Sequence, residues 1–387
     1  MHLTPSEELL LDGEDGYVAQ KAMEILTTLG DIYDADRLIS IRSAQIAGVS
    51  YKTIGDAGLE WISDLAGTVK VPSILNPAGM DRLRWGELGI SEEFAEKQEQ
   101  IIHAYERLGV TAWCTCTPYY LRDDLSRAGD HLAWSESSAV SYANSIMGSR
   151  TNREGGPSAL AAALIGKTPN YGYHLDENRI PTIEIHVEGR LSGTDYGALG
   201  YLAGAIAGDR VPLFQLESVP SNDERKALGA AMAASGAVAL YYVKGVPPHP
   251  VACDIRERIT IEHREIAEVY AHTGRCDPDI IALGCPHCSV AELTELRDLL
   301  RDKTVETEFW VCTSQKLRDQ HPNLVAGIES SGAKVICDTC MVVSPICERY
   351  GRMMVSSGKA LAYVPQMCGV DAVFGSVEEC VRAAVSR

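Results

Sequence analysis

The sequence lacks any apolar run long enough to cross a membrane. None of its segments reaches the roughly 18 consecutive apolar residues that mark a spanning helix. The first residues, Met-His-Leu-Thr-Pro-Ser-Glu-Glu, are acidic, and no basic region precedes an apolar one. They therefore do not read as a secretory signal. We expect a cytoplasmic protein with no membrane partner.

Positive charge is also scarce. Lys and Arg number 35 against 53 Asp and Glu, which gives a formal net charge of −18 at pH 7. Binding a phosphate backbone requires a basic face, so we expect no nucleic-acid partner. A small anionic substrate is not excluded, because it responds only to the few cations that surround it.

Three short catalytic motifs are missing as well. The sequence contains no Gly-x-x-x-x-Gly-Lys-[Ser/Thr], no His-Glu-x-x-His and no Gly-x-Ser-x-Gly. It therefore offers no signature of a P-loop nucleotide site, a zinc hydrolase of that type or a serine hydrolase. No internal repeat or low-complexity linker stands out.

What is present is typical of a globular α/β protein of two or three domains. The 387 residues are 45% hydrophobic and 23% charged. Periodicity predicts helices over 14–29, 92–108, 158–165, 225–235, 255–272, 289–301 and 377–385, and strands over 180–187, 237–243, 279–284, 308–312, 333–338 and 352–356. Strands that alternate with helices in the last third predict a parallel sheet.

These patterns divide the chain into three regions. We predict a mostly helical or irregular region over 1–175, a central α/β segment over 176–255 and a C-terminal βα region over 256–387. With no composition shift to mark a linker, these boundaries follow from the element pattern alone.

The cysteines are the most informative residues. The chain has 12 of them, and in a long cytoplasmic protein they favour reduced thiols, some of them metal ligands, over a disulfide framework. Cys116 lies in Thr-Cys-Thr-Pro-Tyr, Cys285 and Cys288 in Gly-Cys-Pro-His-Cys, and Cys337 and Cys340 in Cys-Asp-Thr-Cys. Thiols so far apart in sequence suit a metal cluster that folding assembles.

The residues that follow the late strands predict a site at one edge of the sheet. They include Cys285, Asp338, Cys340 and Lys359, and ligands of open parallel sheets bind beyond the carboxyl ends of the strands. A zinc site built from the two Cys-x-x-Cys pairs is the alternative, although the pairs are farther apart than in zinc ribbons. One member of each pair can also be a packing residue that faces away from the site, and we expect this of Cys288 and Cys337.

Several polar segments upstream could contact a substrate. Glu136 lies among hydroxyls in Trp-Ser-Glu-Ser-Ser-Ala, and for this segment alone a helix N-cap at Ser135 or Ser137 is the better explanation. Arg150 and Arg153, in Arg-Thr-Asn-Arg-Glu-Gly-Gly, offer guanidinium groups to an anion. The turns over 47–51 and 75–80 could present backbone amides, although most such turns only connect elements. His174 and His287 are weaker candidates.

Six segments, taken in order, resemble the aconitase X family. They are Thr-Cys-Thr-Pro-Tyr, Trp-Ser-Glu-Ser-Ser-Ala, Arg-Thr-Asn-Arg-Glu-Gly-Gly, Gly-Cys-Pro-His, Asp-Thr-Cys-Met-Val-Val and Ser-Gly-Lys-Ala. The resemblance runs along nearly the whole chain. It implies an aconitase-like, multi-domain α/β architecture with parallel sheets and flanking helices. It also implies a large subunit that lacks the swivel domain and forms a heterodimer with a small swivel-domain subunit.

The resemblance also implies the residues of the site. A [4Fe-4S] cluster would be held by Cys116, Cys285 and Cys340. The spacing known from main-line aconitases leaves Cys285, Cys337 and Cys340 as a rival set. Catalytic roles would fall to Glu136 and Ser137, and substrate contacts to Gly48, Val49, Ser50, Asn76, Pro77, Glu136, Ser137 and Lys359. Arg150 and Arg153 join the predicted substrate contacts because of their chemistry and not because of the resemblance.

The activity implied by the resemblance is that of a hydro-lyase. The favoured reaction is dehydration of a small phosphorylated hydroxy acid, (R)-5-phosphomevalonate, to trans-anhydromevalonate 5-phosphate in a modified mevalonate pathway. Dehydration of cis-3-hydroxy-L-proline is the alternative within the family. A zinc-stabilised binding module without catalytic activity is the alternative from another class.

Overall fold

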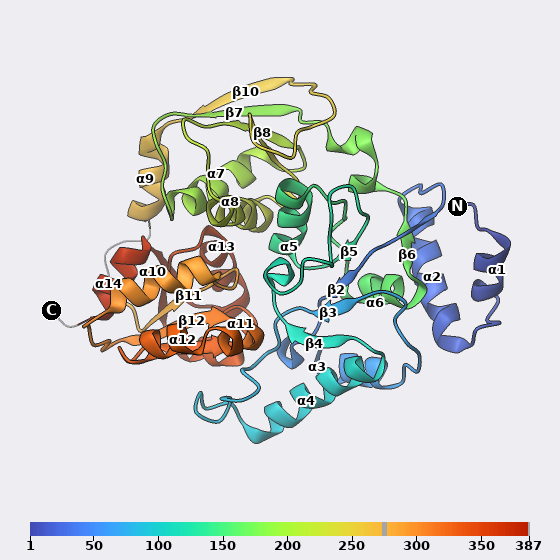
Figure 1. The fold of residues 1–387 in the computed structure, drawn as a ribbon, viewed down its shortest axis with the longest axis horizontal. Coiled ribbons are helices and arrows are strands. Elements are labelled where there is room, and N and C mark those ends of the chain that lie inside the picture. Colours follow the sequence, from blue (N-terminus) through green and yellow to red (C-terminus); the bar gives the residue numbers. More distant parts are fainter. Residues whose placement is uncertain (273–276, 386–387) are drawn as a thin grey trace.

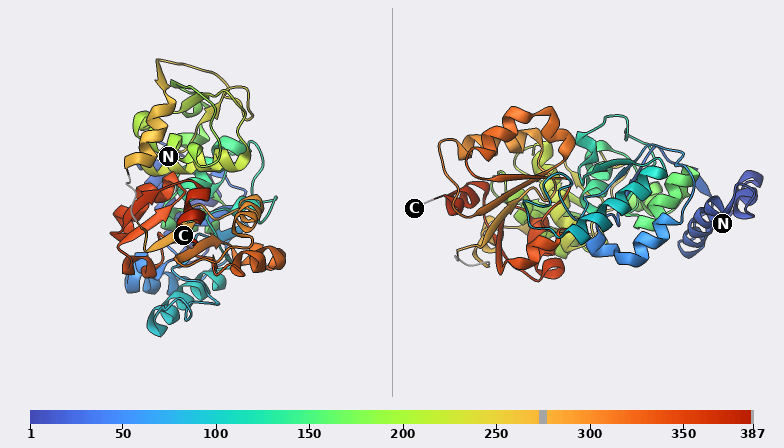
Figure 2. Two further views of the ribbon diagram at one scale, coloured as in Figure 1. Left: turned by 90° about the vertical axis from the view of Figure 1, so that its left-hand side faces the viewer. Right: turned by 90° about the horizontal axis from the view of Figure 1, so that it is seen from below.

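The computed structural model describes residues 1–272 and 277–385 and contains three parallel sheets with flanking helices (Figure 1). Helix α1 (Pro5–Leu11) and helix α14 (Val377–Ala384) lie at opposite ends of its long axis (Figures 1 and 2). Within the described ranges, no helix has both the length and the apolar composition needed to traverse a bilayer. The α/β architecture with parallel sheets predicted from the sequence is confirmed.

The N-terminal sheet is the element that sequence patterns missed. Its order is β4-β3-β2-β5, and all neighbouring strands are parallel. The strands have two to four residues each, too few for a periodic pattern: β2 (Ala44–Ile46), β3 (Ser73–Leu75), β4 (Thr111–Cys114) and β5 (Ala133–Trp134). A separate antiparallel pair, β1 (Leu38–Ser40) with β6 (Lys167–Pro169), lies beside it.

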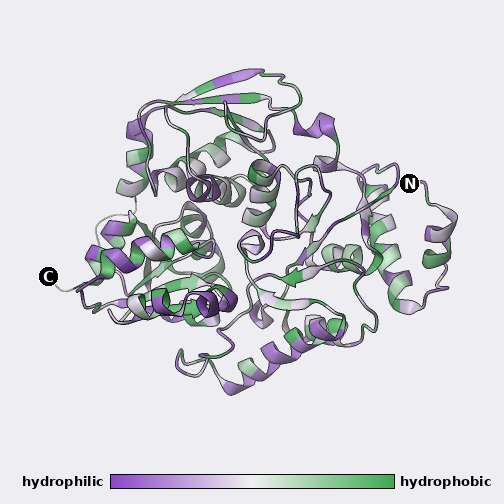
Figure 3. Ribbon diagram, viewed as in Figure 1, coloured by the Kyte–Doolittle hydropathy of each residue, from purple (hydrophilic) through white to green (hydrophobic). Residues whose placement is uncertain are grey.

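Helices predicted for this region are confirmed within a few residues. They are α2 (Tyr17–Ile32), α4 (Glu92–Arg107) and α6 (Gly156–Ile165). The region also contains α3 (Tyr51–Ser63) and α5 (Ser137–Tyr142), which the periodicity did not predict. Helix α6 is buried almost throughout because its small side chains allow close packing against α2 and β2. The outward-facing α4 is largely hydrophilic (Figure 3).

The central sheet has the order β10-β7-β8-β9. Its strands are β7 (Ile183–Val187), β8 (Pro212–Gln215), β9 (Tyr242–Val243) and β10 (Glu257–Ile261), with helices α7 (Asp195–Ala207), α8 (Asn222–Ser235) and α9 (His263–His272). The helix predicted over 255–272 was wrong in its first half, because Glu-Arg-Ile-Thr-Ile forms β10 and pairs with β7. The strand predicted over 237–243 is reduced to its last two residues.

The C-terminal sheet has the order β13-β12-β11-β14-β15, again wholly parallel. Its strands are β11 (Ile280–Leu283), β12 (Glu308–Thr313), β13 (Lys334–Cys337), β14 (Arg352–Val355) and β15 (Asp371–Phe374), with helices α10 (Val290–Leu300), α11 (Gln315–Gln320), α12 (Pro322–Glu329), α13 (Gly358–Cys368) and α14. The predicted strands are confirmed; β15 and α13 were not predicted.

Side-chain alternation separates two cores on the faces of this sheet. Ile280 and Ala282 of β11 join the large central core, whereas Ile281 and Leu283 join the outer core under α10, α12 and α14. Successive side chains of a strand point to opposite faces, so one position in the sequence decides which core a residue enters.

Strand order also fixes where a ligand can enter. In the C-terminal sheet the chain runs from β11 to β12 and β13, then returns to the other side of β11 with β14. In the N-terminal sheet it runs from β2 to β3 and β4, then places β5 on the other side of β2. Each reversal opens a crevice at the carboxyl ends of the strands, which is the usual ligand position in open α/β sheets.

Candidate functional site

The two crevices contribute to one pocket. A cavity of about 280 Å³ collects residues that follow β2, β3, β4 and β5 on one side and β11, β13 and β14 on the other. Its lining residues are Ala47, Asn76, Pro77, Cys116, Ser135, Glu136, Ser137, Arg153, Cys285, Cys340, Val342, Val343, Lys359, Tyr363 and Met367. The carboxyl edges of the two sheets therefore share this pocket, and residues more than 200 positions apart meet there.

Three thiols line this pocket. Cys116, Cys285 and Cys340 are buried, are not in disulfides and border the cavity. Cys288 and Cys337 belong instead to the outer core. The fold therefore puts one member of each Cys-x-x-Cys pair in the pocket and the other in the outer core.

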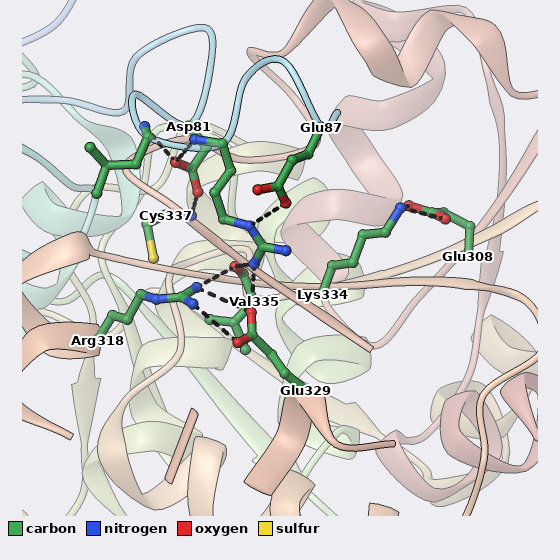
Figure 4. A network of polar contacts seen from close by, with 10 residues as sticks. Asp81, Glu87, Glu308, Arg318, Glu329, Lys334, Val335 and Cys337 are labelled. Atoms are coloured by element: carbon green, nitrogen blue, oxygen red, sulfur yellow. Dashed lines mark hydrogen bonds and ion pairs between the residues drawn. The ribbon is translucent and has the colours of Figure 1, made fainter. Parts of the chain in front are cut away.

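Cys337 illustrates the separation. Its backbone N–H donates to Asp81 at 2.8 Å, and Figure 4 shows it beside a network in which Arg318 contacts Glu329 and the Val335 carbonyl. A tetrahedral zinc site needs its ligands around one point. Among the described residues, no three His, Cys, Asp or Glu side chains surround a position for a single ion. The four paired cysteines thus do not form a zinc site.

His287 joins the three cysteine-bearing loops. Its backbone N–H donates to Cys116 Sγ at 3.1 Å, and its Nε2 lies 2.9 Å from the carbonyl oxygen of Thr339, next to Cys340. Its Nδ1 lies 3.1 Å from Thr115 Oγ1. Burial lowers the pKa of His287 to about 4, so the imidazole is neutral and can accept from Thr115 while it donates to Thr339. His287 was only a weak candidate in the sequence analysis, since only the fold brings its partners together.

Glu136 and Lys359 form a buried ion pair across the pocket. Lys359 Nζ donates to Glu136 Oε1 and, at 3.2 Å, to Ser138 Oγ. Ser137 Oγ donates to Oε1 at 3.1 Å, and the Ala139 N–H donates to Oε2 at 2.8 Å. Glu136 itself therefore caps α5, in place of the predicted Ser135 or Ser137, while its carboxylate also borders the pocket.

The pair fixes the charge state of both groups. Burial alone would raise the pKa of Glu136, but the ammonium of Lys359 and the hydrogen bonds to the carboxylate hold that pKa at about 2. Burial would lower the pKa of Lys359, but the Glu136 carboxylate raises it above its ordinary value. At neutral pH the pocket therefore holds an ionised carboxylate next to a charged ammonium.

Helix α13 presents one face to the pocket. Lys359, Tyr363 and Met367 are four residues apart and all line the cavity. The helix begins at Gly358, where a Cβ would lie 2.1 Å from the carbonyl oxygen of Gly197 in α7. Glycine is thus required for the close approach of backbone that sets the depth of Lys359.

The two arginines of the shared motif have different surroundings. Arg153 lines the mouth of the pocket, and its Nη2 donates to the Tyr363 hydroxyl at 3.2 Å. Arg150 does not reach the pocket: its guanidinium donates to Asp176 and, at 2.9 Å, to the carbonyl oxygen of His174. Arg150 is therefore not among the residues that line this cavity, because a local carboxylate holds its side chain elsewhere, and its contact with the substrate stays a prediction.

The loop after β2 enters the pocket wall through Ala47. Gly48, Val49 and Ser50 follow it and lead into α3, which Ser50 precedes as the N-cap residue. Among the described residues, no acceptor is found for the three amide N–H groups of Gly48, Val49 and Ser50. A Cβ on Gly156 would lie 2.4 Å from the Ala47 carbonyl oxygen, so this loop packs directly on the start of α6.

Asn76 and Pro77, after β3, complete this wall. Asn76 Oδ1 is buried with no hydrogen-bond partner among the described residues. A buried polar atom without a partner is costly, so its place in the lining points to a group that fills the pocket.

A buried charge network lies behind the thiols. The Lys226 ammonium, with 2% of its side chain exposed, pairs with Glu292 and Asp223 and lies 5.2 Å from the centroid of the Tyr120 ring. Asp223 also accepts from the hydroxyls of Tyr120 and Ser289. Tyr120 follows Cys116, Ser289 follows Cys288, and Lys226 lies on α8. The network therefore links the loops that carry Cys116 and Cys285 through helix α8.

The donor set fits a metal cluster. Burial raises the pKa of Cys116 to about 12 and raises those of Cys285 and Cys340. Lys359 opposes each shift, so it is placed to stabilise negative charge on all three sulfurs. Three thiols in one pocket are the type of ligand that iron–sulfur clusters use, and Lys359 is placed to offset their negative charge.

Parallel α/β units that meet at strand ends around such a pocket define an aconitase-like hydro-lyase. The chain belongs to the aconitase X family: models of the first, second and third aconitase X domains match residues 1–177, 181–271 and 278–386. The crystal structure of Thermococcus kodakaraensis aconitase X (holo-form) superimposes with a TM-score of 0.92 at 44% identity, covering 99% of this chain and 100% of that chain. The resemblance read from the sequence is confirmed.

Named relatives carry two activities. The phosphomevalonate dehydratase large subunit of Methanosarcina mazei is 60% identical over 99% of this chain and 97% of its own length. That of Methanothermobacter thermautotrophicus is 51% identical over 99% and 98%. The cis-3-hydroxy-L-proline dehydratase of Pseudomonas aeruginosa is 33% identical over 98% of this chain but only 69% of its own length.

Proposed function

We propose that this chain is the large subunit of a phosphomevalonate dehydratase, which converts (R)-5-phosphomevalonate to trans-anhydromevalonate 5-phosphate in a modified mevalonate pathway. The observation that carries the proposal is the pocket in which Cys116, Cys285 and Cys340 meet Glu136 and Lys359. Support for the substrate comes from relatives of that name at 45% to 60% identity over 99% of the chain. Free thiols at the described cysteines suit a reducing compartment such as the cytoplasm.

Cys116, Cys285 and Cys340 would hold a [4Fe-4S] cluster. When bound through three thiolates, such a cluster supplies an open Lewis-acid iron that polarises the leaving hydroxyl. The rival set that includes Cys337 is not favoured, because Cys337 lies in the outer core while Cys116 lines the pocket.

The pocket residues have separable tasks in this reaction. The ionised Glu136 accepts a hydrogen bond from the substrate hydroxyl, and Ser137 orients the substrate beside it. Lys359 keeps Glu136 charged and places a positive charge where the substrate carboxylate enters. The amides of Gly48, Val49 and Ser50, with Asn76 and Pro77, complete the wall that holds the anion.

The base that removes the α-proton lies outside this chain. A carboxylate whose pKa is about 2 is a weak base, so Glu136 is poorly suited to abstract a proton from carbon. We infer that a small swivel-domain subunit docks on this chain, closes the pocket and supplies the base. Relatives named as large subunits support a partner chain.

The substrate assignment is tested with the large and small chains reconstituted anaerobically. We expect dehydration of (R)-5-phosphomevalonate and no measurable turnover of cis-3-hydroxy-L-proline. Mass spectrometry of the products measures both reactions. The reverse preference would contradict the substrate assignment but leave the hydro-lyase class intact.

The ligand assignment is tested by two matched substitutions. Cys116→Ala is expected to lose bound iron and the visible absorption of the cluster, whereas Cys337→Ala is expected to keep both, since its sulfur lies in the outer core. Iron and sulfide analysis after identical reconstitution provides the measurement. Retention of the cluster by Cys116→Ala, or its loss in Cys337→Ala alone, would favour the rival ligand set.

A further inference from the structure

One buried side chain behind the pocket bonds to two of its loops at once. Gln98 lies on α4, is fully buried and is not among the residues that line the cavity. Its Nε2 donates to the Val49 carbonyl oxygen at 2.8 Å. Its Oε1 accepts from the Tyr51 N–H at 3.0 Å and from the Gly79 N–H at 2.9 Å. Gln98 therefore joins the loop after β2 to the loop after β3 through their backbones.

These contacts require an amide at position 98. Two N–H groups and one carbonyl oxygen converge on the side chain, so it must accept twice and donate once. A neutral amide does both, whereas a carboxylate only accepts and an apolar side chain of the same size does neither. Backbone polar groups that lose their partner in a buried position are costly, so the two loops are expected to shift when the amide is removed.

The two loops also pack tightly against each other. A Cβ on Gly79 would lie 2.6 Å from Ser50 Oγ and 2.9 Å from Gln98 Oε1. The Ser50 hydroxyl in turn donates to the carbonyl oxygen of Val343 at 3.0 Å, in the pocket wall that follows Cys340. The loops are therefore held by α4 and, through Ser50, by the C-terminal part of the chain.

Groups that we propose to hold the substrate lie on these same loops. They are the free amides of the loop after β2, and Asn76 and Pro77 of the loop after β3. Because Gln98 bonds to both loops, it fixes the distance between these groups. A misplacement of about 1 Å caused by a residue remote from the chemistry can cost about a hundredfold in rate.

We propose that Gln98 is a positioning residue that sets the spacing of the two loops and thereby the affinity for the substrate. This inference rests on the proposed function and deepens it. In the sequence, Gln98 lies in the polar run Ala-Glu-Lys-Gln-Glu-Gln, where nothing distinguishes it from its more exposed neighbours. Only the fold shows that it faces inward and bonds to both loops.

The test compares three variants in the anaerobically reconstituted heterodimer. Gln98→Met removes all three contacts at nearly constant side-chain volume. Gln98→Asn keeps the amide but is one methylene shorter, so it is expected to bond to only one loop at a time. Glu99→Gln is the matched control, because Glu99 is the next residue of α4 and its carboxylate pairs with Arg82.

We expect Gln98→Met to raise KM for (R)-5-phosphomevalonate about tenfold and to change kcat by less than about threefold, since the loops bind the substrate before and during the reaction. Gln98→Asn should raise KM by less, and Glu99→Gln should keep the wild-type KM. A role in stability alone gives a different result. KM does not depend on the amount of folded enzyme, so partial unfolding would lower the measured kcat and leave KM unchanged.

Hydrogen exchange provides a readout that does not depend on the substrate. The N–H groups of Tyr51 and Gly79 donate to Gln98, so they should exchange faster in Gln98→Met and at the wild-type rate in Glu99→Gln. If Gln98→Met does not fold, Gln98→Asn takes its place in both measurements.

An unchanged KM in the folded Gln98 variant overturns the inference, whether or not the exchange is faster. If the wild-type heterodimer does not dehydrate (R)-5-phosphomevalonate, the proposed substrate fails instead. The same comparison of KM values with cis-3-hydroxy-L-proline then decides the role of Gln98.

Discussion

At the scale of single residues, charge in this pocket is set by pairing and not by residue type. Glu136 is ionised because Lys359 and three hydrogen-bond donors surround its carboxylate. Arg150 and Arg153 share a motif, yet only Arg153 is left without a carboxylate partner in the described part of the chain. The available charge at a site therefore depends on which neighbours the fold supplies.

His174, which is buried away from the pocket, links protonation to the stability of the fold. Its Nδ1 lies 3.0 Å from Nδ1 of His131, and burial, with His131, Arg179 and Arg150 nearby, lowers the pKa of His174 to about 3. The unfolded chain binds a proton at this histidine below about pH 6.5, while the folded chain does not until much lower pH. This contribution to stability is therefore complete above the unfolded pKa and is lost as pH falls.

We expect the free energy of unfolding to fall by about 1.4 kcal/mol per pH unit from this group below about pH 6.5. Urea unfolding at about pH 7.5 and about pH 5 measures this change in the free energy of unfolding. The same measurement on His174→Gln provides the comparison. The variant should lose less stability over this range than the wild type. Equal losses in both proteins would show that His174 is protonated in the folded state.

At the scale of elements, the site depends on the short strands of the N-terminal sheet and on helix α8. Strands β2, β3 and β5 have two or three residues each, yet they place Ala47, Asn76 and Glu136 in the pocket wall. Such strands are stabilised by burial and parallel pairing rather than by propensity, so no periodic signal marks them. Longer strands such as β12 and strongly periodic helices such as α4 were predictable from sequence.

Lys226 on α8 is expected to hold two cysteine loops in place as a positioning residue. Lys226→Met removes the buried ammonium and leaves the partly exposed carboxylates of Glu292 and Asp223 without their cation, which is expected to cost about 1–3 kcal/mol. Reconstituted iron content should fall together with the free energy of unfolding. Lys21→Met, which breaks an exposed pair with Glu24, is the control and should leave the free energy of unfolding nearly unchanged, because exposed ion pairs contribute little.

Urea unfolding and iron analysis on the same preparations separate the two effects of Lys226. If Lys226→Met is destabilised while it binds iron as well as the control, the network supports the fold but does not position the cysteines.

At the scale of the whole molecule, two parallel sheets with the same strand reversal share one pocket at their carboxyl edges. This explains how residues 47 and 359 come to line the same cavity. It also leaves the mouth, with Arg153 and the 45% exposed Met367, accessible to a partner chain.

The isolated large chain is expected to bind the substrate and not to dehydrate it. Its most acidic pocket carboxylate is a poor base, so proton abstraction awaits the partner subunit. Calorimetry with (R)-5-phosphomevalonate and an activity assay, each before and after addition of the small subunit, provide the measurement. Dehydration by the large chain alone would place the base within this chain.

The sequence by itself determined the α/β class, the longer helices and strands, and the segments that contain the site, because periodicity and local motifs are written in neighbouring residues. It also identified the thiols that could bind metal. Only the tertiary structure decided which sulfur of each Cys-x-x-Cys pair enters the pocket, which arginine keeps a free charge, and that His287 joins the cysteine loops. These outcomes depend on sheet faces, burial and partners distant in sequence, and none of these is encoded by local spacing.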